Sequence, residues 1–271
     1  MIQVPDFGNR FWVYQAVDLR SDSFVQIGKM YGSTPGFYLL TGPNWHGEVP
    51  QGITEVFRAS TNTGFVVPRV FMDDTAEDRR AIQPLLQQIL MYPLAEYDDA
   101  LKSIDWSTIP KLPNPATGEQ EIIWVPTGSF ADTLPDVLAD APPLPGEEAR
   151  YVQVLAVLDA AKDDEQLKVA MTEGAVEAEE QLVNPFFQFR NYGQQPYNRS
   201  TISNEAAFGT DYFTRTAVAK SNIFVNTPKE TKYFYQDLDK DAVQFVINIR
   251  CSPRSHLLDR FIALRTNHSS Y

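Results

Sequence analysis

The feature that most constrains the fold is a series of short apolar runs, separated by turn residues, in the first 70 residues. Five of these runs have the length and composition of β-strands, and they cover Arg10–Asp18, Phe24–Gly28, Gly36–Leu40, Thr54–Arg58 and Phe65–Val70. Glycine and proline turn signals lie between them. Strands at such close spacing predict an antiparallel sandwich or barrel rather than a βαβ unit, which needs a longer crossover. The first run is largely apolar on both faces, which predicts a central strand covered on both sides.

After these runs the spacing of apolar residues changes from that of a strand to that of a helix. Asp74 and Glu77 form a capping box, and residues up to Leu90 follow helical spacing, with Pro84 expected to kink the helix. Proline-rich irregular sequence follows, and then three further helices are expected, starting near Ser129, after Pro145 and at Asp164. The chain is therefore predicted to be an α+β protein with an N-terminal antiparallel β-sandwich of jelly-roll type and a helical middle segment.

Strand-like composition returns late in the chain. Aromatic and β-branched residues recur at Tyr212–Val218, Ile223–Val225 and Lys232–Tyr235, and a further strand is expected within Ala242–Ile249. These runs predict a second β region after the helices.

Composition and charge exclude several classes of protein. The net charge of −12 disfavours binding to nucleic acid, because an acidic surface repels phosphate backbones. No apolar stretch is long enough for a membrane-spanning helix, and the single cysteine, Cys251, allows no internal disulfide. No phosphate-binding glycine loop and no Gly-x-Ser-x-Gly elbow occurs, so we expect neither a cofactor nor a serine triad. Asp237, Asp239 and Asp241 lack the glycine and glutamate of a calcium loop, so we also expect no metal site.

Several segments carry a family resemblance, namely Val4–Asp6, Gly28–Gly32, Gly36–Leu40, Gly42–Trp45, Pro68–Val70, Pro142–Glu148 and Gly209–Tyr212 through Tyr233–Tyr235. Over nearly all of residues 2–241 the sequence resembles the two-domain bacterial family of domain of unknown function 1254 joined to domain of unknown function 1214. The resemblance implies two β-sandwich domains joined by helices. It implies no particular reaction.

The resemblance also implies a periplasmic or exported location, because members of the family often carry an export signal. Here the sequence starts at Met1, one residue before the tail of the early strand that precedes Val4–Asp6 in the family, without a charged and apolar leader. After Asp241 the family pattern stops, and the last residues hold four arginines against one aspartate, unlike the acidic remainder. The expectation is a chain truncated at both ends, or a disturbed reading frame, with an incomplete second β domain.

The expected domain organisation has four parts. Residues 1–95 form the 1254-like β-sandwich domain ending in a helix, and residues 96–190 form an irregular and helical connection. Residues 191–241 begin the incomplete 1214-like β domain, and residues 242–271 form an atypical tail.

The candidate site is a set of polar residues within the aromatic strand-like segments: Asp18, Arg58, Arg69, Tyr212 and Arg215. Charged residues in such segments are seldom buried without a partner. One interpretation is a set of salt bridges that fix strand register. The other is a cleft in which arginine and tyrosine orient an anionic or sugar-like ligand, with Asp18 as acid or base.

These observations leave three functional hypotheses open. The first is an uncharacterised β-sandwich protein of cell-envelope type that binds a small molecule or associates with itself as a homo-oligomer. The second is a hydrolase or lyase that uses carboxylate, tyrosine and arginine chemistry in a cleft. The third is a purely structural sandwich that self-assembles. Insertion into a membrane and binding to nucleic acid are not expected in any of them.

Overall fold

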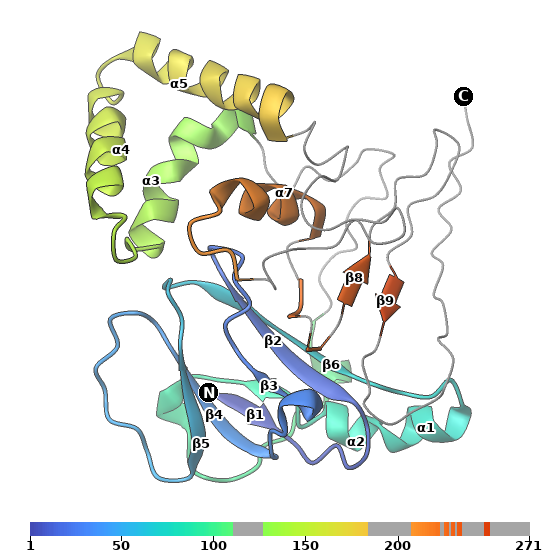
Figure 1. Ribbon diagram of the computed structural model, residues 1–271. Helices are drawn as coiled ribbons and strands as arrows, with labels where there is room; N and C mark the ends of the chain where they lie inside the picture. The colour runs from blue at the N-terminus through green and yellow to red at the C-terminus, as the bar shows by residue number, and fades with distance from the viewer. Residues whose placement is uncertain are drawn as a thin grey trace, which may run out of the picture. The chain divides into compact units, whose positions relative to one another are not determined.

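The computed structural model describes residues 1–110, 127–183, 207–222, 225–227, 229–230, 232–234 and 247–249 (Figure 1). The chain divides into two compact units. Unit 1 comprises Met1–Leu19, Phe24–Trp124 and Asp140–Pro142, and unit 2 comprises Arg20–Ser23, Val125–Ala139 and Pro143–Tyr271. Among the described residues, no helix has the length and apolar character needed to cross a membrane.

Unit 1 is built on two open sheets. The first sheet has the strand order β5-β4-β1-β7 and the second has the order β3-β2-β6. The strands are β1 Ile2–Val4, β2 Trp12–Asp18, β3 Ile27–Gly28, β4 Gly36–Thr41, β5 Ile53–Arg58, β6 Gly64–Val70 and β7 Leu90–Met91. The prediction of an α+β protein with N-terminal strands in open sheets is confirmed, whereas the jelly-roll topology stays a prediction.

The pairing of β4 with β5 differs from the prediction. The two strands run parallel, with Leu39 beside Val56 and Thr41 beside Arg58, whereas the other pairs of unit 1 are antiparallel. Glycine and proline in residues 42–52 suggested a tight reversal, but the connection is long enough to return the chain to the start of β4. Strands β1 and β7 were not predicted, because each is too short to show alternation.

Strand β2 is the centre of the second sheet, as predicted. All seven of its residues are buried, and it pairs with β3 on one side and along its whole length with β6 on the other. One of its faces, with Trp12, Tyr14 and Ala16, packs with β1 and β4 residues in a shared core. The two sheets of unit 1 therefore enclose a common apolar interior, as in a sandwich.

A buried amide fixes β1 within this unit. Gln3 is fully buried, and its Nε2 donates to the carbonyls of Gln88 and Lys102, each at 2.8 Å. Its Oε1 accepts from the backbone N–H of Lys102 at 2.9 Å. Because a buried amide without partners is costly, these bonds explain how a polar side chain is accommodated in the interior.

The first helical segment is broken near Pro84, as predicted. Helix α1 covers Ala76–Ala81 and helix α2 covers Gln83–Leu86, with the proline in the first turn of α2. Thr75, rather than Asp74, caps α1, since its side chain accepts the backbone N–H of Asp78 at 3.1 Å. Proline lacks the N–H that would continue the preceding helix, so it begins a new one instead. Short 3₁₀ turns of unit 1 are η1 Lys29–Tyr31, η2 Leu94–Glu96 and η3 Trp106–Thr108.

Unit 2 is mainly helical in its described part. Its elements are η4 Thr127–Ser129, α3 Phe130–Asp140, α4 Glu148–Ala160, α5 Glu165–Ala178, the π-helical turn η5 Glu179–Val183, α7 Tyr212–Asn222, and the antiparallel strands β8 Lys232–Phe234 and β9 Ile247–Ile249 (Figure 1). The last residue of α3 is grouped with unit 1. Helices α3, α4 and α5 confirm the predicted helical segment, and Asp164 caps α5 by accepting two backbone N–H groups at 3.0 Å.

The strand predicted at Tyr212–Val218 is wrong, because these residues begin helix α7. Asp211 explains the difference, since its carboxylate accepts the N–H of Thr214 at 3.1 Å and caps the helix. The aromatic and β-branched residues favoured a strand only weakly, and this local cap and the packing of Ala217 and Val218 outweigh that preference. The predicted strand at Ile223–Val225 lies mainly outside the described residues, and the three aspartates and Cys251 lie wholly outside them.

Candidate functional site

The three site candidates in unit 1 each bond to a different partner. Asp18 is buried at the end of β2 and accepts a hydrogen bond of 2.6 Å from the hydroxyl of Ser60. Arg58 donates to the carbonyls of Gly42, Pro43 and Trp45 at 2.9–3.2 Å, so it fastens the loop after β4. Arg69 donates to Gln15 Oε1 across the β2–β6 pair at 2.7 Å. These contacts support a structural role, and whether any of the three binds a ligand stays a prediction.

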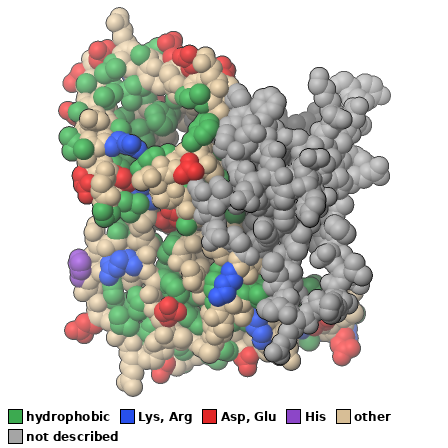
Figure 2. Space-filling view, in the orientation of Figure 1, with side chains coloured by type: hydrophobic (Ala, Val, Ile, Leu, Met, Phe, Trp, Pro, Cys, Tyr) green, Lys and Arg blue, Asp and Glu red, His purple; other side chains and the backbone are tan. Residues whose placement is uncertain are grey.

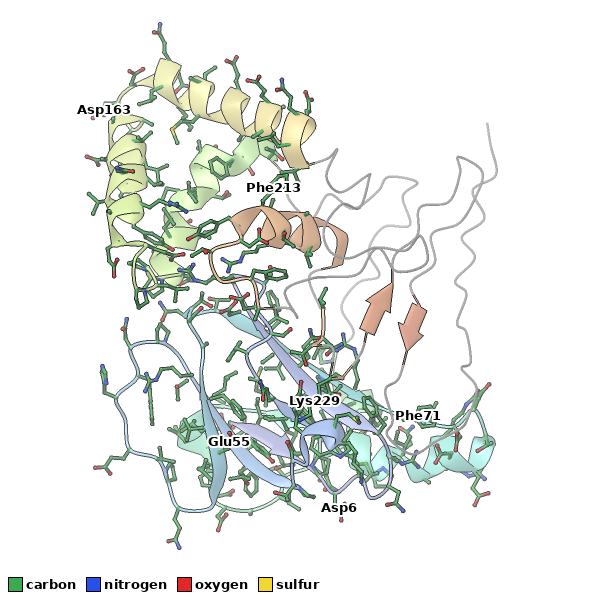
Figure 3. All side chains as sticks on the ribbon, in the orientation of Figure 1. Asp6, Glu55, Phe71, Asp163, Phe213 and Lys229 are labelled. Carbon is green, nitrogen blue, oxygen red and sulfur yellow. The ribbon has the colours of Figure 1, made fainter. Side chains whose placement is uncertain are left out.

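The two candidates in unit 2 lie together on α7. Tyr212 and Arg215 are one turn apart, and the Arg215 guanidinium lies 5.6 Å from the centre of the Tyr212 ring. Figure 3 shows this helix beside the label of Phe213, with side chains directed towards the neighbouring helical segments of unit 2. The structure thus joins two of the five predicted residues in one group.

A buried carboxylate, that of Glu147, organises the residues around Tyr212. Arg20 approaches it with two nitrogens, Nη2 at 3.0 Å from Oε2 and Nη1 at 3.3 Å from Oε1. The hydroxyl of Tyr212 donates to Oε1, and the backbone N–H of Leu144 donates to Oε2 at 2.9 Å. Arg20 also donates to the hydroxyl of Tyr151 at 3.1 Å. Both side chains of the ion pair are only 6% exposed, so the pair is protected from solvent.

A second ion pair lies beside the first. Arg215 Nη2 is 3.3 Å from Asp22 Oδ2 and donates to the carbonyl of Gly209 at 2.7 Å. The other oxygen of Asp22 accepts the backbone N–H of Phe208 at 2.7 Å. Asp22 and Arg20 come from the same short loop between β2 and β3, in which Ser21 has a positive φ of 61°. The loop therefore supplies one charged partner to each ion pair.

A second arginine, Arg150, also contacts the ring of Tyr212. The Arg150 guanidinium lies 4.8 Å from the ring centre, which is a cation–π distance. Arg150 is exposed on the first turns of α4, and within the described part of the chain no ion pair or hydrogen bond of its side chain is found. We refer to Arg20, Glu147, Arg150, Tyr212 and Arg215 together as the Tyr212 cluster.

The electrostatics of the cluster fix the protonation of its two central groups. Burial tends to raise the pKa of Glu147, but hydrogen bonds from Tyr212 and Leu144 and the charge of Arg20 together lower it below its usual range. The hydrogen bond to Glu147, with burial, raises the pKa of Tyr212. Glu147 is therefore an anion and Tyr212 is a neutral phenol that donates to it.

Sequence reasoning missed most of this cluster. In the sequence Glu147 stands out only as part of the Pro142–Glu148 segment, and Arg20 and Asp22 lie in a turn that carries no motif. The signal that could have drawn attention to them was a pair of opposite charges, Arg20 and Asp22, shortly after a largely apolar strand. Their partners are more than a hundred residues away in sequence, so no local spacing reveals the pairing.

The described residues contain no group of three or more histidine, cysteine, aspartate or glutamate side chains arranged to hold a metal ion. Acidic and basic side chains lie dispersed among hydrophobic ones over the coloured part of the face seen in Figure 2.

Comparisons with known proteins agree with the fold. No curated protein matches the chain. The structure is similar to the crystal structure of the VPA0106 protein from Vibrio parahaemolyticus, with a TM-score of 0.56 and 16% sequence identity, over 90% of this chain and 58% of that chain. This chain therefore spans somewhat over half the length of that protein, and at this identity the similarity shows the fold alone. The expected similarity to domain of unknown function 1214 stays a prediction, whereas residues 1–93 match the family model described as "Protein of unknown function (DUF1254)".

Proposed function

We propose that the protein binds a small anionic ligand, a carboxylate or an oxyanion such as sulfate or phosphate, at the Tyr212 cluster. The observation that carries this proposal is the placement of Arg150. Its guanidinium is exposed, lies 4.8 Å from the Tyr212 ring, and has no hydrogen bond to the described residues. The guanidinium is held beside the Tyr212 ring while its N–H donors have no partner among the described residues. Two such parallel donors match the geometry of a carboxylate or an oxyanion.

Arg215 adds a second set of donors next to the first. Its Nη2 is committed to Asp22 and Gly209, but its buried Nε has no hydrogen-bond partner in the described part of the chain. A buried N–H without a partner costs free energy, and an anion at this point would satisfy it. The nearby carboxylates of Asp211 and Glu148 accept backbone N–H groups, of Thr214 and Gly146 respectively.

The same geometry favours binding over acid–base catalysis. Tyr212 has a raised pKa and donates its proton to Glu147, so it is not a base at neutral pH. Glu147 is held as an anion by Arg20, by Tyr212 and by a backbone N–H, and its side chain is 6% exposed. Both groups thus position the Tyr212 ring and the arginines rather than transfer protons.

The proposal is tested by thermal unfolding in the presence of sulfate, succinate or glucose at constant ionic strength. We expect saturable stabilisation by sulfate or succinate and none by glucose, because ligand that binds only the folded protein raises its stability. Arg150→Gln should weaken the apparent affinity about tenfold, a typical effect of losing charge-assisted hydrogen bonds. Arg79→Gln, which removes an exposed arginine of α1, is the matched control and should behave as the unsubstituted protein. Equal responses from all three proteins would refute the proposal.

A second candidate function, self-association, is favoured by helix α4. This helix carries apolar residues around much of its circumference, and Val152 and Leu155, one turn apart, are 68% and 47% exposed. Helices of this composition are usually covered. We propose that a second copy of the chain covers this face. Sedimentation of the protein and of Val152→Glu tests it, since only the unsubstituted chain should associate as concentration rises.

A further inference from the structure

A buried glutamate in unit 2 lies outside the Tyr212 cluster. Glu230 is only 2% exposed, and neither of its carboxyl oxygens has a hydrogen-bond partner in the described part of the chain. It ends a tight turn in which its own N–H donates to the carbonyl of Thr227 at 2.9 Å. Burial of an ionised carboxylate without partners is costly, so this position favours the neutral acid.

The charges of the described side chains near Glu230 do not remove this cost. Burial raises its pKa to about 7, and the charge of the neighbouring Lys229, which is exposed and labelled in Figure 3, opposes the shift only in part. The charged side chains of the adjoining loop, Arg20 and Asp22, pair with Glu147 and Arg215. The acid therefore titrates in the physiological range.

The chain just before the turn of Glu230 is hydrogen-bonded to the loop Arg20–Ser23. The hydroxyl of Ser23 donates to the carbonyl of Val225 at 2.6 Å, and Ser23 closes the loop Arg20–Ser23. Two residues of that loop, Arg20 and Asp22, form the ion pairs with Glu147 and Arg215. The hydrogen bond of Ser23 therefore joins Val225, five residues before Glu230, to the loop that forms both ion pairs.

We propose that Glu230 is a proton-controlled latch for the loop Arg20–Ser23, and through it for the Tyr212 cluster. With Glu230 neutral, the segment Val225–Glu230 stays packed and Ser23 is held, so Arg20 and Asp22 keep their positions. Loss of the proton leaves a buried charge without a hydrogen-bond partner among the described residues, which favours opening of this part of the chain and release of the loop. The consequence for ligand binding rests on the proposed function, whereas the latch itself does not.

Hydrogen exchange of the backbone amides in residues 20–23, without ligand and corrected for intrinsic exchange rates, tests the latch. Between pH 5 and pH 7 we expect the opening constant to rise about tenfold per pH unit, then to level off, because the open form releases the proton at lower pH. Glu230→Gln and Glu230→Leu should both abolish this dependence. Glu173→Gln, an exposed site on α5, should retain it. A flat profile in the unsubstituted protein, or the same slope in both Glu230 variants, would overturn the proposal.

A second measurement separates the latch from the binding site. Sulfate keeps its charge over this pH range, so its affinity is measured at pH 5.5 and pH 8 in the unsubstituted protein and in Glu230→Gln. We expect the affinity for sulfate to fall between pH 5.5 and pH 8 by a larger factor in the unsubstituted protein than in Glu230→Gln. If sulfate does not bind but the opening constant depends on pH as expected, only the binding proposal is refuted. If sulfate binds but the opening constant does not depend on pH, only the latch is refuted.

Discussion

Replacement of Arg20 by methionine tests the energetic role of the buried ion pair. The side chain is 6% exposed, contacts both oxygens of Glu147, and donates to Tyr151. Arg20→Met leaves the Glu147 carboxylate buried with the Tyr212 hydroxyl and the N–H of Leu144 as its remaining donors among the described residues. Breaking a buried pair from one side typically costs 3–5 kcal/mol, and because two donors remain we expect a loss of about 3 kcal/mol.

The double variant Arg20→Met, Glu147→Met separates the cost of an orphaned charge from the contribution of the pair. Replacing both members of a buried pair with apolar residues is often nearly neutral, so we expect the double variant to lose less than Arg20→Met alone. This non-additivity would show that Arg20→Met is destabilised by an unpaired carboxylate rather than by lost packing.

The assay can follow each unit separately. The tryptophans among the described residues, Trp12, Trp45 and Trp106, lie in unit 1, whereas α3, α4, α5 and α7 lie almost wholly in unit 2. Urea unfolding is therefore monitored by tryptophan fluorescence for unit 1 and by helical circular dichroism mainly for unit 2. The Arg20 variants should shift the circular dichroism transition. A change in the free energy of unfolding below about 1 kcal/mol, or a change seen in fluorescence alone, would contradict the proposed role of the Arg20–Glu147 pair in unit 2.

Three further predictions follow from individual side chains. Tyr212→Phe should cost about 2 kcal/mol in urea unfolding, because it removes a hydrogen bond to a buried charge; an unchanged midpoint would contradict that bond. Asp18→Ala should cost about 1–3 kcal/mol, the range for leaving Ser60 without its acceptor, and a near-neutral result would instead favour a ligand role for Asp18. For Glu230 the folded pKa lies above the value of 4.5 expected in the unfolded chain, so its contribution to stability is complete below about pH 4.5 and is lost as pH rises to about 7. The loss should be about 3 kcal/mol in the unsubstituted protein and absent in Glu230→Gln, as measured by denaturation at a series of pH values.

Much of unit 1 follows from its sequence because the relevant signals are local. The largely apolar character of Trp12–Asp18 on both faces predicts a strand covered on both sides, and its seven buried residues confirm this. The helix break at Pro84 follows directly from the missing N–H of proline. The parallel pairing of β4 and β5 does not follow, because it depends on the path of residues 42–52 and not on any single turn signal.

The candidate site could be predicted only in part, for a physical reason. Tyr212 and Arg215 attract attention as polar groups in an apolar segment, although the segment is a helix and not the expected strand. Their partners come from the loop Arg20–Ser23 and the start of α4, which lie far apart in the sequence and are joined only by the fold. Buried ion pairs of this kind leave no periodic pattern in the sequence.

The most direct test of the central claim, that an anion binds at the Tyr212 cluster, is a titration of sulfate into protein labelled with ¹⁵N-arginine. The Nε–H signals of Arg150 and Arg215 report on the two guanidinium groups that contact the Tyr212 ring. We expect saturable shifts of these two signals with a common dissociation constant, while the signal of Arg79, which is paired with Asp74 on the surface, stays in place. Shifts that are equal at all three arginines, or that grow without saturation, would contradict the claim.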